Sequence, residues 1–165
     1  MKFTRLLLSL VCVAAMFGMG CGVQVDEPLP PPAKTQAPAA PASVSAAVKD
    51  AAGAIEATAV YFAFDRYDLN DQAQAALKAK AELLKRYPGI SVKIEGHCDS
   101  RGTESYNLAL GERRAKAAYD YLVMQGVNPS QLAMVSYGHL YPAVSGTGEA
   151  VWSKNRRAEF RPSIK

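Results

Sequence analysis

Between residue 60 and the C-terminus the chain contains four short segments in which apolar side chains follow a strand pattern. Val60–Phe64 is rich in β-branched and aromatic residues, and in 90–95 apolar residues alternate with polar ones. The segments 132–137 and 158–163 have the same character. Alternation with a period of two is typical of a half-buried β-strand. The pattern therefore predicts four strands.

Two longer segments follow the helical period instead. A cap at Asn70 or Asp71 begins a helix that is expected to run to Tyr87, because apolar residues recur there every three to four positions. A second helix is expected over about 105–125, and Gly126 ends it.

The order of these elements is βαβαββ, which predicts an α+β sandwich with a mixed four-stranded sheet and both helices on one face. A Gly-rich excursion through Ser145–Gly148 separates the last two strands. Its length suggests a functional or mobile loop.

The first 20 residues have the layout of a signal peptide. Met1–Arg5 carries two positive charges, Leu6–Phe17 is almost wholly apolar, and small residues precede Cys21. This layout resembles a bacterial lipobox, although Gly18 stands where such sequences usually have Leu. The resemblance implies that Cys21 is lipidated. The alternative is an ordinary leader that happens to end near a cysteine.

A Pro-rich and then Ala-rich stretch follows, and we interpret 21–57 as a lipidated linker. The prolines between Val23 and Pro41 favour an extended spacer. The segment from Ser43 to Ala57 could form a nascent helix, but Gly53 in its middle disfavours one. The folded domain is then expected to cover 58–165. Gly22, the residue after the lipobox, favours the outer membrane by resemblance, with the domain on the periplasmic side.

Charge and cysteine content exclude two classes of protein. The net charge is +4, and loss of the leader with Lys2 and Arg5 leaves 17 basic against 15 acidic residues. This near-balance disfavours nucleic acid as a partner. The three cysteines, Cys12, Cys21 and Cys98, lie in different contexts and predict no disulfide framework.

Several polar motifs fall at the ends of the predicted strands and along the second helix. They are Phe62–Asp65, Glu95–Gly102, Tyr106–Leu108, Gly111–Ala115 and Ser153–Ala158. Together these motifs resemble the OmpA-like peptidoglycan-binding domain over about 60–164, and within that family they look most like its lipid-anchored members. Cys98 departs from the family pattern, which usually has Thr or Ala there.

The resemblance implies recognition of meso-diaminopimelate in an uncrosslinked peptide stem. The side chain of this amino acid ends in an ammonium and a carboxylate on one carbon. Asp99 matches the family aspartate that accepts the ammonium, and Arg114 matches the arginine whose planar fork clamps the carboxylate. Further family positions that line the groove are Phe64, Asp65, Asn107, Leu110 and Arg156.

The same resemblance implies no cofactor. It implies an outer-membrane protein that tethers the membrane to the cell wall, supports envelope integrity and division, and has TolB and other Tol proteins as partners.

Four of these site residues also have an ordinary structural interpretation. Asp99 alone is more often a turn residue, and Arg114 alone is more often a surface charge on a helix. Phe64 could belong only to the core, and Asn155 with Arg156 could merely close the last loop.

Two chemical alternatives remain. His97 and Asp99 are potential metal ligands, but they lack a third at suitable spacing, so no metal is expected. A cell-wall amidase or hydrolase could use His97 and Asp99 with a metal or with Ser100 as nucleophile. No hydrolase or zinc-protease motif accompanies these residues.

Overall fold

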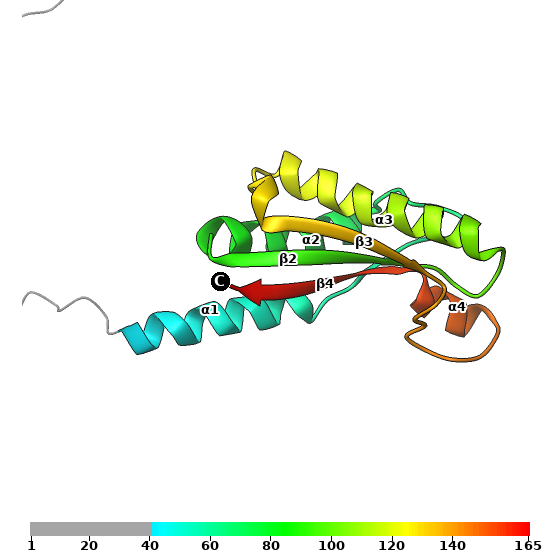
Figure 1. The fold of residues 1–165 in the computed structure, drawn as a ribbon, viewed down its shortest axis with the longest axis horizontal. Helices are drawn as coiled ribbons and strands as arrows, with labels where there is room; N and C mark the ends of the chain where they lie inside the picture. Colours follow the sequence, from blue (N-terminus) through cyan, green and yellow to red (C-terminus); the bar gives the residue numbers. More distant parts are fainter. Residues whose placement is uncertain (1–40) are drawn as a thin grey trace, which may run out of the picture. The chain divides into compact units, whose positions relative to one another are not determined.

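The computed structural model describes residues 41–165, in which four strands form one mixed sheet (Figure 1). The strand order is β1-β4-β2-β3; β4 is antiparallel to β1 and β2, while β3 is parallel to β2. This confirms the expected α+β fold. In chain order the elements are α1 Pro41–Glu56, β1 Val60–Tyr61, α2 Asp71–Arg86, β2 Ile90–His97, α3 Glu104–Met124, the 3₁₀ turn η1 Pro129–Gln131, β3 Leu132–Gly138, α4 Glu149–Asn155 and β4 Arg157–Ile164.

The main core lies between the sheet and the helices α2 and α3. The alternating residues Ile90, Val92 and Ile94 of β2 are all buried and belong to it. Burying such side chains contributes about 1.5 to 3 kcal/mol each. The helices supply mainly small and branched residues, among them Leu77, Ala81 and Leu84 of α2 and Ala115, Ala118 and Leu122 of α3.

Two glycines let α3 approach the sheet closely near the end of β2. A Cβ atom on Gly96 would lie 1.9 Å from the carbonyl oxygen of Gly111, and one on Gly111 would lie 2.3 Å from the Ser136 hydroxyl. Neither position has room for a side chain. The beginning of α3 is therefore held against the carboxyl end of β2, where the predicted site residues lie.

The prediction that Ser43–Ala57 is a linker was wrong, because α1 covers this segment and packs beside β4 (Figure 1). Ala51 and Ile55 of α1 are buried in the core, and the Lys80 ammonium donates a hydrogen bond to the Ile55 carbonyl. Gly53 is exposed with open space around it. Its helix-weakening effect is local and is outweighed by burial of the opposite face.

The first strand is shorter than expected, since only Val60 and Tyr61 pair with β4. The Phe62 N–H still bonds to the Arg156 carbonyl at 2.9 Å, after which the chain turns away from the sheet. Asp65 has a φ of 55°, the left-handed conformation that Asp tolerates better than most residues. This turn directs the end of the predicted strand into the site.

The Gly-rich excursion between β3 and β4 contains a helix that the sequence analysis did not predict. This helix, α4, follows Gly148, whose φ is 101° and which makes no side-chain cap. Two hydrogen bonds between the Asn155 amide and the Val144 backbone close the excursion.

In the region 41–165, no helix has the length and apolar character needed to cross a bilayer. The leader, Cys21 and the Pro-rich stretch lie outside the described residues, so the predictions made for them stay predictions.

Candidate functional site

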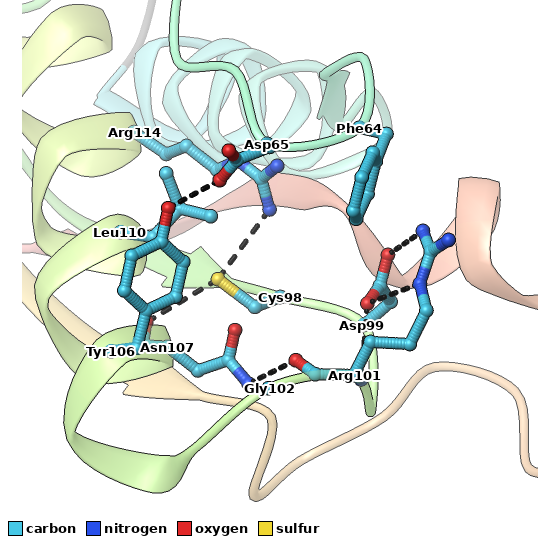
Figure 2. Close-up of a pocket in the computed structure, with 10 residues that line it drawn as sticks. All are labelled: Phe64, Asp65, Cys98, Asp99, Arg101, Gly102, Tyr106, Asn107, Leu110 and Arg114. Carbon is cyan, nitrogen blue, oxygen red and sulfur yellow. Dashed lines mark hydrogen bonds and ion pairs between the residues drawn. The ribbon is translucent and has the colours of Figure 1, made fainter.

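A pocket of about 200 Å³ opens where β1 and β2 end and α3 begins (Figure 2). β1 and β2 are both antiparallel to β4, so their carboxyl ends meet at the same edge of the sheet. Three segments distant in sequence line the pocket. They are Phe64 and Asp65 after β1, the loop residues Cys98, Asp99, Arg101 and Gly102 after β2, and Tyr106, Asn107, Leu110 and Arg114 of α3.

Six of the seven site residues predicted from the sequence line this pocket, and the seventh, Arg156, lies behind it in contact with Asp99. Phe64 is 58% exposed, so it is not a core residue. Leu110 is buried and supplies an apolar wall.

Arg114 is the most deeply placed charge of the pocket, with no exposed surface. Its Nε–H donates to the Arg66 carbonyl at 2.9 Å, and Nη1 and Nη2 donate to the His97 and Ala63 carbonyls at 2.9 and 3.2 Å. Nη1 also contacts the Cys98 sulfur at 3.5 Å. These partners fix the guanidinium at the ends of both strands.

None of the partners of Arg114 carries a formal charge. Across residues 41–165 it forms no ion pair with a carboxylate. Burial lowers the pKa of Arg114, but a guanidinium in a protein still keeps its proton. A buried cation without a counter-ion is costly, so the pocket is suited to an anionic group.

Asp99 is buried, and its carboxylate is already occupied. Oδ1 accepts from the backbone N–H and the Nε–H of Arg101, both at 3.1 Å, and Oδ2 accepts from Arg101 Nη2 at 2.6 Å and from Arg156 Nη1 at 3.4 Å. Burial raises the pKa of Asp99, but the hydrogen bonds and charge of Arg101 and Arg156 together outweigh it, and the net shift is downward. Asp99 is therefore ionised at neutral pH.

Arg101 belongs to the motif Glu95–Gly102 and lines the pocket, although it is not among the predicted site residues. Its guanidinium lies between two aromatic rings, 3.9 Å from the centre of Phe64 and 4.1 Å from that of Trp152. Figure 2 shows it folded over Asp99 below Phe64. Trp152 belongs to α4, the helix that was not expected, so the sequence held no signal for this sandwich.

Asp65 is an exposed carboxylate near the mouth of the pocket. It accepts a hydrogen bond from the Tyr106 hydroxyl and, within the described part of the chain, forms no ion pair. The pocket thus contains one unpaired cation at its base, Arg114, and one unpaired anion at its mouth.

Asn107 and Arg156 hold the surrounding loops in place. Asn107 Nδ2 donates to the Arg101 carbonyl at 2.8 Å. Arg156 Nε donates to the Phe62 carbonyl at 3.1 Å, and its Nη2 pairs with Glu149. Arg156 therefore connects Asp99 to the end of β1 and to α4. Its role is wider than the alternative considered from the sequence, in which it only closes the last loop.

His97 does not share a site with Asp99. Its ring lies in a second pocket with Glu95 and Glu159, and the three potential ligand atoms are all within 4.8 Å of one another. These carboxylates already pair with Lys93, Arg157 and Arg161. A metal ion would have to compete with these three cations for the carboxylates of Glu95 and Glu159.

Comparisons with known proteins place this geometry in a family context. The model of the OmpA family matches residues 61–156. A peptidoglycan-associated lipoprotein of Pseudomonas aeruginosa is 47% identical over 119 residues, covering 72% of this chain and 70% of the relative. One from Pseudomonas putida is 51% identical over 104 residues, covering 63% and 62%. The chain thus spans less than two thirds of the second relative.

Solved structures give the same picture. The peptidoglycan-associated lipoprotein of Burkholderia pseudomallei superposes with a TM-score of 0.63 at 44% identity, covering 64% of this chain and 89% of that one. The C-terminal domain of Helicobacter pylori MotB reaches 0.61 at 23% identity, covering 66% and 85%, which shows a shared fold alone.

Proposed function

Since the chain belongs to the OmpA family, as its match to that family's model over more than half its length shows, we propose that it binds peptidoglycan without chemically altering it. The ligand is meso-diaminopimelate in an uncrosslinked peptide stem. The names of its relatives and the lipobox-like leader support a lipoprotein of the outer membrane, anchored at Cys21.

The observation that carries the proposal is the unpaired guanidinium of Arg114 at the base of a pocket that also contains carboxylates. The distal carbon of diaminopimelate carries one carboxylate and one ammonium. The carboxylate would accept a hydrogen bond from the N–H of Arg114 that has no partner within the described residues, and Asp99 would face the ammonium. Leu110 and Phe64 would pack against the apolar part of the side chain.

A comparison of two tripeptides tests the Arg114 contact without altering the protein. L-Ala-γ-D-Glu-meso-diaminopimelate and its L-lysine analogue both carry the ammonium, but only the first carries the distal carboxylate. A charge-assisted hydrogen bond contributes about 1.5 to 3 kcal/mol, so we expect the diaminopimelate peptide to bind the full-length protein at least roughly tenfold more tightly. Equal affinities in calorimetry would reject the contact.

Substitution of the two charged groups tests the site on the natural polymer. Asp99→Ala and Arg114→Ala are each expected to abolish sedimentation of the protein with purified sacculi, because each removes one half of a zwitterion clamp. Arg113→Ala is the matched control, since this neighbouring arginine is exposed and does not line the pocket. Thermal melting separates loss of binding from loss of fold, and retained sedimentation by both folded variants would contradict the proposal.

The rival function is a wall amidase or hydrolase. A binding protein releases no soluble fragments from sacculi, so chromatography of the supernatant distinguishes the two functions. Fragments released by the wild type would identify an enzyme.

We also propose that TolB is a partner and competes for this pocket, as the family resemblance implies, and that the protein keeps the outer membrane close to the wall during division. Capture of TolB from a periplasmic extract should fall when the diaminopimelate tripeptide is added. Capture that the tripeptide leaves unchanged would place the partner elsewhere.

A further inference from the structure

The Asp99 carboxylate has no acceptor site left for a ligand. A carboxylate offers about four lone-pair sites, and here four N–H donors occupy them, three from Arg101 and one from Arg156. An incoming ammonium can therefore bond to Asp99 only after a donor has left.

From this arrangement we infer that the Arg101 side chain is a displaceable internal cation, which occupies the ligand's ammonium position on Asp99 and must swing away before a stem peptide binds. The inference rests on the proposed function and adds to it the step that opens the site.

The surroundings of the two arginines decide which of them moves. The Arg156 side chain is 6% exposed and is tied to the Phe62 carbonyl and to Glu149 as well as to Asp99. The Arg101 side chain is 32% exposed. In the described residues its guanidinium has Asp99 as its one hydrogen-bond and ion-pair partner and otherwise lies against the faces of Phe64 and Trp152, with the exposed Glu149 carboxylate nearby. A cation–π interaction imposes no fixed hydrogen-bond direction, so the Arg101 side chain can leave its position between the two rings without breaking a hydrogen bond to either of them.

The exchange leaves the charge of the site balanced. When Arg101 leaves, the ligand ammonium replaces one cation on Asp99 with another, and the ligand carboxylate supplies the counter-ion that Arg114 lacks. A ligand with only the ammonium would displace Arg101 and leave Arg114 without a counter-ion. A ligand with only the carboxylate would pair with Arg114 while Asp99 kept its bonds to Arg101 and Arg156. A zwitterionic head group is therefore the ligand that engages both Asp99 and Arg114.

Arg101→Met tests the inference, because Met removes the cation and keeps an unbranched apolar side chain. If Arg101 competes with the ligand, the apparent dissociation constant for the diaminopimelate tripeptide falls roughly tenfold, since the binding-competent state no longer requires displacement. Arg113→Met is the matched control, because it removes one positive charge from an exposed position outside the pocket, and its affinity is expected to stay within about twofold of the wild type.

The outcomes separate the inference from the function beneath it. If the wild type binds the tripeptide and Arg101→Met binds it equally or more weakly, Arg101 is not a competitor and the inference is overturned while the proposed function stands. If the wild type does not bind the tripeptide, both are overturned.

A measurement on the wild type makes the test independent of whether the variant folds. In the free protein, the Arg101 Nε–H is bonded to Asp99 Oδ1, so its NMR signal should exchange slowly with water. Addition of the tripeptide is expected to shift this signal and speed its exchange. A signal that keeps its position and exchange rate at saturating tripeptide would show that Arg101 stays in place, which contradicts the inference.

Discussion

At the scale of single residues, the His97 imidazole is ionisable and buried but takes no part in the proposed binding, to which His97 contributes only its backbone carbonyl. His97 is 2% exposed, and neither ring nitrogen has a hydrogen-bond partner in the described residues. Burial and the nearby charge of Arg157 lower the pKa of His97 to about 4. The native state therefore accepts this proton with difficulty, whereas the unfolded chain takes it up near pH 6.5.

This difference predicts a loss of stability in mild acid. Between about pH 6.5 and 4 the unfolded state binds a proton that the folded state refuses, so the free energy of unfolding falls as pH falls through that window. From pH 7 to pH 5 the contribution of His97 amounts to about 2 kcal/mol. Urea unfolding of the wild type and of His97→Gln at both pH values measures it, because the other titrating groups are common to both proteins. An identical pH dependence in the two proteins would contradict the prediction.

The site residues show what a motif predicts and what it leaves out. Asp99 and Arg114 were predicted from their motifs, and the structure brings both into one pocket. The contact of Arg101 with Asp99 could not be predicted from the sequence. The position of the Arg101 side chain depends on Trp152, which lies some fifty residues later in the chain. The pairing of Asp99 with Arg101 and Arg156 is likewise a tertiary property.

At the scale of elements, α1 extends the folded domain beyond the expected boundary. It packs against β4, the Arg161 guanidinium pairs with Glu56 at 2.6 Å, and Lys80 of α2 bonds to the carbonyl of Ile55. β1 covers only the first two residues of β4. α1 therefore shields a part of the domain that the short first strand leaves open.

A pair of substitutions in α1 tests whether this helix is part of the domain. Ile55→Ala is expected to lower the free energy of unfolding by about 2 to 5 kcal/mol, because Ile55 is fully buried. Gly53→Ala is expected to raise it by about 0.5 to 1 kcal/mol, because Gly53 is exposed within the helix and has open space around it. Chemical denaturation measures both. A linker would be insensitive to either change.

The elements missed by sequence reasoning share a physical cause. α1 is Ala-rich with a central glycine, so its stability comes from docking on the core and not from its own propensity. α4 has only seven residues and lacks a side-chain cap. The long periodic elements α2 and α3 were predicted closely, and Asn70 caps α2 as expected.

At the scale of the whole molecule, single pockets of this kind are expected to bind weakly, since two charge-assisted contacts must also offset the ordering of the ligand. Many copies facing one polymer would bind firmly through effective concentration. This mode of attachment depends on an anchor that holds the copies in the same membrane.

Cys21→Ser tests that dependence. The variant should bind the diaminopimelate tripeptide with unchanged affinity, because Cys21 is remote in sequence from the pocket residues, but outer-membrane fragments should no longer sediment with sacculi through this protein. Mass spectrometry of the mature wild type should show the added mass of acyl chains on Cys21. An unmodified cysteine would contradict the anchor.

The three carbonyl groups around Arg114 have a consequence for the life of the chain in the cell. One belongs to His97 at the end of β2, and the other two belong to Ala63 and Arg66 in the turn after β1. These segments meet only when β1 and β2 are both paired with β4, so on the proposed function an unfolded chain is expected to have no affinity for the stem peptide. If the proposed function holds, copies that have not yet folded would not be retained by the wall, and attachment would begin only with the folded protein.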